Sequence, residues 1–356
     1  MDAITLQRYI VRLRALACVR RDVVHATWRW LAMLALAVVS LPLDAVQSES
    51  LGRLQLAQTI ALPDVRGRID HLDLDVQEQR LFVAALGNNS LEVVDLRGAK
   101  RSERIAGLRE PQGVLYLAEQ KRLFVANGQG ARVDVFTGSP LRTVGQVDGL
   151  EDADNMRYDR ISGNVYVGYG SALATIAAQN VQLLGHIDLP GHPESFQIES
   201  AGPRMFVNVP SARQITIIDR NKREVIGAWV LDDAAANFAM ALDEQDHRLF
   251  VATRRPAALL AYDTQTGKRV AKLAICGDAD DLFYDAARKR IYVVCGEGLV
   301  DIVHQRDPDH YETFNRIKTA PGARTGLFAP TRNALYVAVP ARGLSSAEIR
   351  VYTTTN

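Results

Sequence analysis

Acidic residues recur along this chain of 356 residues at intervals that suggest a shared site. Asp70, Asp154, Glu194 and Asp280 are separated by 84, 40 and 86 residues, which is one or two steps of a period near 42. Carboxylates that lie close together raise one another's pKa unless a cation compensates. Carboxylate and amide oxygens are also the ligands that Ca²⁺ prefers. Such a set could bind a polar ligand or a metal ion.

Two histidines are candidates for acid–base chemistry beside these carboxylates. His71 directly follows Asp70, and His192 lies two residues before Glu194. Neither belongs to an H-E-x-x-H motif, and the chain has no G-x-S-x-G elbow and no phosphate-binding glycine loop. The sequence therefore assigns no catalytic residue with certainty, and His71 and His192 are only candidates.

A repeated strand shows which elements would position these residues. Its seven copies are RLFVAA from Arg80, RLFVAN from Arg122, NVYVGY from Asn164, RMFVNV from Arg204, RLFVAT from Arg248, RIYVVC from Arg290 and ALYVAV from Ala334. The second residues of successive copies are 42, 42, 40, 44, 42 and 44 positions apart. Each copy follows a shorter strand and a polar turn, and two further strands come after it. Four antiparallel strands repeated at this period predict an all-β fold, a seven-bladed β-propeller.

The last repeat lacks a fourth strand, because the chain ends after AEIRVYTTT. A matching segment, LQLAQTIALP, occupies residues 54–63 and resembles the fourth strand VQLLGHIDLP at residues 181–190. We predict that this N-terminal strand completes the last blade, which would close the ring and leave no unpaired edge between first and last blades.

Aligning the repeats also predicts which residues meet at the mouth of the central channel. In a propeller the first strand of each blade lines the channel, and the mouth residues stand eleven and ten positions before the second residue of the repeated strand. The polar residues at these positions are Asp70, His71, Gln112, Asp154, Asn155, Glu194, Asp280, Asp281 and Arg324. Asn237 lies next to the same ring and is included with them. Asp154, Glu194 and Asp280 could hold a metal ion such as Ca²⁺. The alternative is a merely hydrated channel, since Asp and Asn also favour turns before strands.

Two of the three cysteines flank one pair of strands. Cys276 precedes the first strand of the sixth repeat and Cys295 ends the second, so both should lie on one face. In an oxidising compartment such a pair favours a disulfide, and closing a loop of about 20 residues would contribute roughly 3 kcal/mol. No C-x-x-C motif is present, which excludes thioredoxin chemistry and haem attachment.

The first 45 residues differ in kind from the rest. They carry six arginines, followed by the apolar run LAMLALAVVSLPL at residues 31–43, which is too short to span a bilayer. Residues 1–45 are expected to be a signal peptide cleaved near Ala45, or else a retained membrane anchor. Their removal leaves 36 basic and 38 acidic residues in a domain of residues 46–356. This balance makes nucleic acid an unlikely partner.

The repeated strand has the pattern [RN]-h-[FY]-V-[AGV]-[NT], where h is a hydrophobic residue, and it is followed by a turn and a strand that ends in h-h-D. This pattern resembles the YVTN-type repeats of YncE-like secreted bacterial propellers. The resemblance covers residues from about 51 to 356. It implies a periplasmic or extracellular protein, and it transfers no catalytic motif residue by residue.

Two functions are compatible with these features. The first is a secreted monomeric propeller without a reaction, which binds a small molecule or an envelope protein through its channel face and contacts a membrane only through residues 1–45. The alternative is a metal-dependent hydrolase or lyase of the lactonase type. In that case a cation at the channel mouth polarises a carbonyl while His71 or His192 moves a proton.

Overall fold

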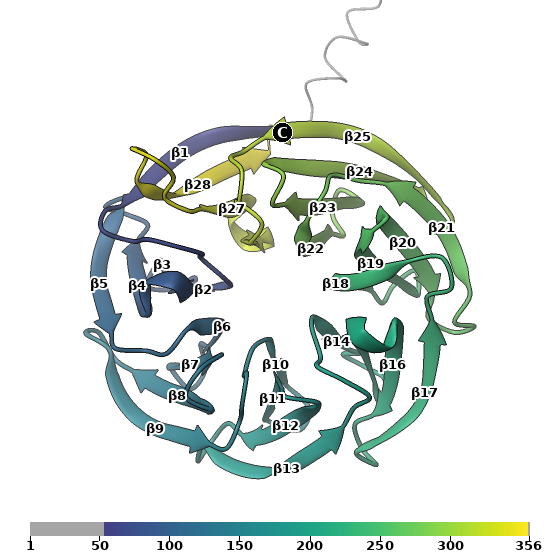
Figure 1. Ribbon diagram of the computed structural model, residues 1–356, viewed down its shortest axis with the longest axis horizontal. Coiled ribbons are helices and arrows are strands. Elements are labelled where there is room, and N and C mark those ends of the chain that lie inside the picture. Colours follow the sequence, from purple (N-terminus) through teal and green to yellow (C-terminus); the bar gives the residue numbers. More distant parts are fainter. Residues whose placement is uncertain (1–52, 355–356) are drawn as a thin grey trace, which may run out of the picture. The chain divides into compact units, whose positions relative to one another are not determined.

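The computed structural model describes residues 53–354, which form a ring of seven four-stranded antiparallel sheets (Figure 1). The predicted seven-bladed β-propeller is confirmed. The expected signal or anchor at residues 1–45 lies outside the described residues. Among residues 53–354, no helix is long and apolar enough to cross a membrane. The helices in this part of the chain are three short 3₁₀ turns, η1 (Leu86–Asn88), η2 (Pro210–Ala212) and η3 (Pro330–Arg332).

The first six blades follow one another along the chain, each running from the channel to the rim. Blade 1 consists of β2 (Leu72–Asp75), β3 (Arg80–Ala85), β4 (Ser90–Asp95) and β5 (Lys100–Ala106). Blade 2 consists of β6 (Pro111–Leu117), β7 (Arg122–Asn127), β8 (Arg132–Thr137) and β9 (Arg142–Asp148). Blade 3 consists of β10 (Met156–Asp159), β11 (Asn164–Tyr169), β12 (Ala172–Ala177) and β13 (Gln182–Asp188).

The other half of the ring has the same order of strands. Blade 4 consists of β14 (Phe196–Ile198), β15 (Arg204–Val209), β16 (Gln214–Asp219) and β17 (Glu224–Val230). Blade 5 consists of β18 (Ala235–Asp243), β19 (Arg248–Arg255), β20 (Ala257–Asp263) and β21 (Arg269–Ala274). Blade 6 consists of β22 (Ala279–Asp285), β23 (Arg290–Cys295), β24 (Leu299–Asp307) and β25 (His310–Lys318). Blade 7 consists of β26 (Gly326–Ala329), β27 (Ala334–Val339), β28 (Ala347–Thr354) and β1 (Leu54–Leu62).

Blade 7 closes the ring by combining both ends of the described chain. β1 pairs with β28 in antiparallel register from Leu54 opposite Thr354 to Leu62 opposite Ala347, and the two strands lie side by side in Figure 1. The prediction that the N-terminal strand completes the last blade is therefore confirmed.

Packing between blades explains why the second strand is so strongly repeated. In β3, Leu81 and Val83 belong to the cluster shared with blade 7, whereas Phe82 and Ala84 belong to the cluster shared with blade 2. Both faces of this strand are buried, so every position after the first must be apolar. The repeated sequence is thus a packing signature of the fold.

The arginine that opens many of these strands links neighbouring blades. Arg80 Nη1 donates to the carbonyl of Gly138 at 2.9 Å, and Arg248 Nε donates to that of Pro308 at 2.8 Å. Arg122 and Arg204 make equivalent hydrogen bonds, to Ala178 and to Thr264. In each case the acceptor lies in the turn between the third and fourth strands of the next blade. The repeated arginine therefore links blades 1, 2, 4 and 5 to their successors.

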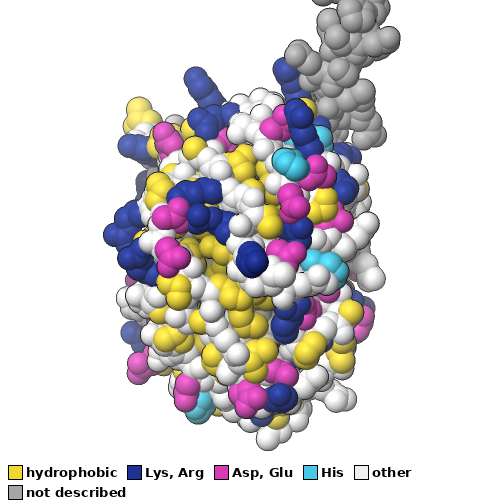
Figure 2. Space-filling view, turned by 90° about the vertical axis from the view of Figure 1, so that its right-hand side faces the viewer, with side chains coloured by type: hydrophobic (Ala, Val, Ile, Leu, Met, Phe, Trp, Pro, Cys, Tyr) yellow, Lys and Arg dark blue, Asp and Glu magenta, His cyan; other side chains and the backbone are white. Residues whose placement is uncertain are grey.

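The outer strands share an irregularity at one position in every blade. One residue of each outer strand is skipped in the pairing with its inner neighbour; these residues are Ala57, Ser102, Val144, Leu184, Ile226, Val270 and Phe314. Such β-bulges increase twist and discourage edge-to-edge pairing. Figure 2 shows the rim over β17, β21 and β25, where hydrophobic, basic and acidic side chains are interspersed.

Candidate functional site

Hydrogen bonds between adjacent blades hold the channel mouth together. The amide of His71 donates to the carbonyl of Gln112 at 3.2 Å, and the amide of Ser195 donates to that of Phe238 at 3.2 Å. The hydroxyl of Thr325 donates to the carbonyl of Ile69 at 3.2 Å, which links blade 7 to blade 1. The first strands therefore begin at one level, and the predicted mouth residues start from a common ring.

His71 occupies the centre of this arrangement. Its Nε2 lies 3.6 Å from Asp154 Oδ1, and its Nδ1 lies 3.5 Å from Asp281 Oδ1. The side-chain amide of Asn155 lies 3.2 Å from Nε2. Burial alone would lower the pKa of His71, but the nearby carboxylates, with that of Asp281 foremost, outweigh it and raise the pKa to about 10. His71 is therefore an imidazolium that holds two carboxylates, and it is poorly suited to act as a general base near neutral pH.

A glycine allows His71 to reach Asp154 across the intervening blade. A Cβ atom at Gly113 would lie only 2.1 Å from the backbone carbonyl oxygen of Asp154. No side chain can occupy this position without a shift of the backbone. The close approach of blades 2 and 3 at the mouth therefore depends on Gly113.

Arginines surround the other mouth carboxylates. Arg68 lies 3.0 Å from Asp70 Oδ2 and 3.7 Å from Asp280 Oδ2. Arg254 forms a short ion pair with Asp280, and its guanidinium stacks over the ring of Phe238 at 3.8 Å from the centroid. Asp280 is thus shared between two arginines from different blades.

Asp278 links Arg254 to the arginine predicted at the mouth. Its Oδ1 lies 3.3 Å from Arg254 Nε, and its Oδ2 lies 2.8 Å from Arg324 Nη2. Arg324 therefore neutralises Asp278 and forms no ion pair with Asp154 or Glu194.

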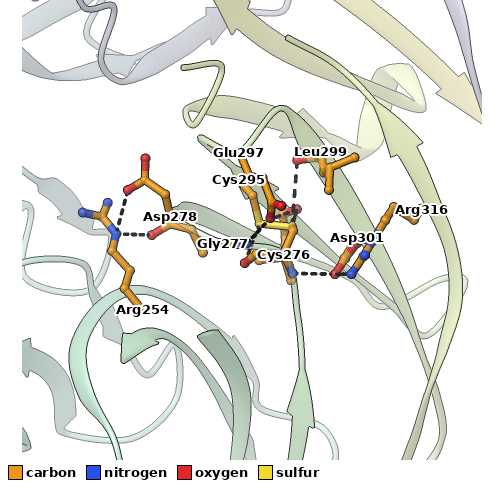
Figure 3. Close-up of a disulfide and its surroundings, with 11 residues drawn as sticks. Arg254, Cys276, Gly277, Asp278, Cys295, Glu297, Leu299, Asp301 and Arg316 are labelled. Atoms are coloured by element: carbon orange, nitrogen blue, oxygen red, sulfur yellow. Dashed lines mark hydrogen bonds and ion pairs between the residues drawn. A yellow bond between two sulfur atoms is a disulfide. The ribbon is translucent and has the colours of Figure 1, made fainter. Parts of the chain in front are cut away.

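A disulfide supports the backbone that carries Asp278 and Asp280 (Figure 3). Cys276 and Cys295 are bonded, with Cα atoms 5.9 Å apart, and both are buried. The amide of Cys276 donates to Asp301 Oδ2 at 2.8 Å, and Asp301 is paired in turn with Arg316. The amide of Gly277 donates to Glu297 Oε2 at 2.7 Å. The start of blade 6 is thus anchored on both sides of the disulfide.

The mouth contains more negative than positive side chains. Six carboxylates, those of Asp70, Asp154, Glu194, Asp278, Asp280 and Asp281, face four cations, His71, Arg68, Arg254 and Arg324. Burial raises the pKa of Asp154 to about 6, and burial with the charge of Asp70 raises that of Asp280 to about 6. Burial and the charges of Asp154 and Asp280 raise the pKa of Glu194 to about 8.

Two of these carboxylates have an oxygen that accepts no hydrogen bond from residues 53–354, although His71 Nε2 lies 3.6 Å from Asp154 Oδ1. Asp154 is 7% exposed, and its Oδ1 accepts no hydrogen bond. The carboxylate of Glu194 makes neither a hydrogen bond nor an ion pair with any residue in 53–354. A buried carboxylate oxygen without a donor is costly, so the mouth can accept a positive group.

The carboxylates do not converge as metal ligands. Within residues 53–354, no group of three or more His, Cys, Asp or Glu side chains is arranged to hold a metal ion. Of the three candidates for a Ca²⁺ site, Asp280 faces Arg68 and Arg254, Asp154 faces His71, and Glu194 forms no ion pair with any residue in 53–354. Cations thus pair with two of the three predicted metal ligands, and the metal site stays a prediction.

Three other predicted residues lie at the edge of the site or outside it. Gln112 donates to Asp152 Oδ1 at 3.2 Å, and His192 Nδ1 lies 3.0 Å from the carbonyl oxygen of Gly170. Asn237 is fully buried, and its amide donates to Asn208 Oδ1 at 2.9 Å and to the carbonyl of Gln214 at 3.0 Å. Asn237 thus joins blades 4 and 5, and His192 is not brought to His71.

The sequence interpretation missed Arg68 at the mouth and Asp73 and Arg157 below it. Asp73 and Arg157 stand three positions after the ring residues Asp70 and Asp154. The equivalent positions in other blades are Leu115, Gln197, Ala241, Phe283 and Leu327. Asp73 and Arg157 are thus the two charged residues at a position that is uncharged in the other five blades. The alignment of the repeats could have revealed them for this reason. Arg68 precedes the ring in an irregular segment and had no such signal.

The fold and the charged channel define the class of this protein, a seven-bladed β-propeller, and comparisons with known proteins agree. No family model matches the chain. It is similar to YncE of Salmonella typhi and of Salmonella typhimurium, at 24% identity over 168 residues, which cover 45% of this chain and 46% of each relative. The chain thus spans about half the length of the curated relatives that it matches.

Solved structures share the architecture at low sequence identity. A chain of hydrazine synthase from Kuenenia stuttgartiensis has a TM-score of 0.69 at 15% identity, covering 82% of this chain and 100% of that chain. A chain of the mitotic checkpoint complex has a TM-score of 0.73 at 13% identity, covering 86% and 93%. The WD40 repeats of RRP9 have a TM-score of 0.74 at 8% identity, covering 85% and 100%. These likenesses show the fold alone.

Proposed function

We propose that this protein is an exported propeller of the YVTN repeat type that binds a small, positively charged molecule at its channel mouth and catalyses no reaction. The observation that carries the proposal is the unsatisfied Oδ1 of Asp154, 7% exposed, beside the unpaired Glu194. An ammonium or guanidinium group would supply the missing donor and offset the excess of carboxylates. The similarity to YncE supports a propeller of this kind.

Two features argue against a metal-dependent enzyme. His71 carries a proton that its carboxylate neighbours stabilise, with a pKa of about 10. The carboxylates are separated by cations and do not form a ligand set. Binding therefore accounts for the arrangement better than hydrolysis does.

Export is supported by the sequence and by the disulfide. The arginines and the apolar run before Ala45 are typical of a signal peptide. Disulfides persist in oxidising compartments such as the periplasm, and Cys276 and Cys295 form one. We propose a periplasmic or extracellular monomer whose partner is a small molecule.

Thermal unfolding of the full chain with matched probes tests the binding proposal. Butylamine and agmatine should raise the melting temperature by a few degrees at about 100 times Kd, where a ligand contributes about 2.7 kcal/mol. Butyrate, the matched anion, should produce no comparable rise. At neutral pH the amine should also displace a proton from Glu194, which calorimetry in buffers of different ionisation enthalpy would detect.

Two variants of equal charge change locate the site. Asp154→Asn with Glu194→Gln should abolish the rise, whereas Asp188→Asn with Glu224→Gln on the outer strands should retain it. Both control side chains are exposed, at 88% and 56%. If no amine stabilises the wild type, the small-molecule proposal is wrong, and a protein partner for the channel face becomes the hypothesis to test.

A further inference from the structure

A cavity lies inside the channel, just below the layer that His71 occupies. Its volume is about 180 Å³, and the residues that line it include His71, Asp73, Leu115, Arg157, Asp281 and Phe283. This is the liquid volume of about six water molecules at about 30 Å³ each. The cavity therefore suits a molecule the size of a small amino acid, and a nucleotide would not fit.

Arg157 lines this cavity with a guanidinium that has few partners. Its Nη1 donates to the carbonyl of Met156 at 2.7 Å, and its Nη2 donates to the hydroxyl of Ser195 at 3.3 Å. It forms no ion pair with any carboxylate of residues 53–354. The ring of Phe196 supports it at 5.5 Å. A guanidinium has five N–H donors, so donors remain for a ligand, and a carboxylate matches their geometry.

Asp73 lines the same cavity and likewise forms no close ion pair with any residue in 53–354. Its Oδ1 accepts the amide of Leu74 at 2.7 Å, and its Oδ2 accepts the amide of Tyr116 at 2.5 Å. These two hydrogen bonds fix the carboxylate in place but leave it with acceptor capacity. A half-buried cation and a half-buried anion thus face one cavity without forming a direct ion pair, which leaves both able to pair with a ligand.

Part of the remaining wall is apolar, and the cavity shares two of its lining residues with a groove. Leu115, Phe283 and Leu327 lie on the channel wall, so the body of a ligand would contact hydrocarbon. Asp73 and Leu115 also line a groove of about 590 Å³ with residues of the turns after the first strands. That groove opens on the face opposite the mouth.

We infer that the channel cavity binds a small zwitterion of amino-acid size with an apolar body, whose carboxylate pairs with Arg157 and whose ammonium pairs with Asp73. This inference rests on the proposed function, because it requires that the channel takes up a small molecule. It adds a second, interior site below the mouth.

Calorimetric titration of the full chain with L-valine, isovalerate and isobutylamine tests the inference. Isovalerate lacks the amino group of L-valine, and isobutylamine lacks its carboxylate. L-Valine should bind the wild type at least about tenfold more tightly than either fragment, since each charged contact contributes to affinity. Equal binding of isovalerate, or no binding of any of the three, would overturn the inference.

Variants assign the two charges. Arg157→Met should weaken L-valine binding about 100-fold or more, because the carboxylate loses its partner. Asp73→Asn should bind L-valine and isovalerate equally. Arg142→Met, which removes an exposed guanidinium of the outer strand β9, should bind like the wild type. Undiminished binding of L-valine by Arg157→Met would overturn the assignment.

A second substitution covers the case in which Arg157→Met fails to fold. Arg157→Lys keeps the charge but loses the planar fork, and we expect about tenfold weaker binding of L-valine. The outcome can be separated from that of the proposed function. If butylamine stabilises the protein through Asp154 and Glu194 while L-valine does not bind, the interior site is wrong and the mouth site stands.

Discussion

Charged side chains at the mouth form their ion pairs mostly with residues of other blades rather than with residues of their own blade. His71 of blade 1 contacts Asp154 of blade 3 and Asp281 of blade 6, and Arg254 of blade 5 contacts Asp280 of blade 6. Asp281 also accepts the amide of Gly326 in blade 7 at 2.8 Å. Because each contact joins different blades, the ionisation of the mouth is coupled to the packing of the ring.

Glu194 provides a test of this coupling. Burial raises its pKa from 4.5 to about 8, so the folded state binds more protons than the unfolded state between these values. The contribution of Glu194 to stability is therefore present at low pH and is lost as the pH rises through about 8. Glu194→Gln removes this penalty. We expect its free energy of unfolding, relative to the wild type, to increase by about 2–4 kcal/mol from about pH 5 to about pH 9.

Urea unfolding of both proteins at these pH values measures the difference. Glu224→Gln removes an exposed carboxylate and should show a difference that does not change with pH. A constant difference for Glu194→Gln as well would mean that its carboxylate is ionised normally.

The sequence predicted which residues lie at the mouth of the channel, but it did not predict which of them form ion pairs with one another. Asp154 and Asp280 could be placed because the period fixes which residues begin each first strand. Their partners depend on how far a side chain reaches, and His71 meets Asp154 only because Gly113 leaves room between them. Arg157 lies one layer deeper, where most blades have uncharged residues, and a search limited to the first ring could not find it.

The strands carry two kinds of cross-link between elements. Arginines at the start of the second strands reach the next blade, as Arg80 does to Gly138. The disulfide joins the segment before β22 to the end of β23, so it fixes the first two strands of blade 6 at the mouth. Local cross-links of this kind matter in a propeller because the core of each blade packs mainly against its two neighbours.

Removing the disulfide should destabilise the protein and disturb the mouth. The double variant Cys276→Ser with Cys295→Ser opens a loop of 19 residues, and we expect it to lower the free energy of unfolding by about 3 kcal/mol. Denaturant unfolding under oxidising conditions measures this loss. A reductant should not affect the native wild type, because the two cysteines are 2% and 0% exposed. Equal stability of the variant and the wild type would contradict the structural role.

At the scale of the whole ring, stability depends on one closure between distant parts of the sequence. β1 supplies the outer strand of blade 7, and its Ile60 and Leu62 are fully buried in the cluster that also contains Leu81 of blade 1. β1 thus covers β28 and contributes to the interface between the last blade and the first. An open ring would expose this interface as well as the edge of β28.

Deleting residues 50–62 should therefore unfold the ring cooperatively, and the loss should not be confined to blade 7. Each buried Ile or Leu side chain alone contributes about 2–5 kcal/mol when truncated, which approaches the total stability of many domains. Circular dichroism and hydrogen exchange would follow the loss in all blades. A synthetic peptide of residues 50–62 added in trans should restore the fold, because it can pair with β28 in the same register. A deletion variant with unchanged melting behaviour would show that the first and last blades hold together without this strand.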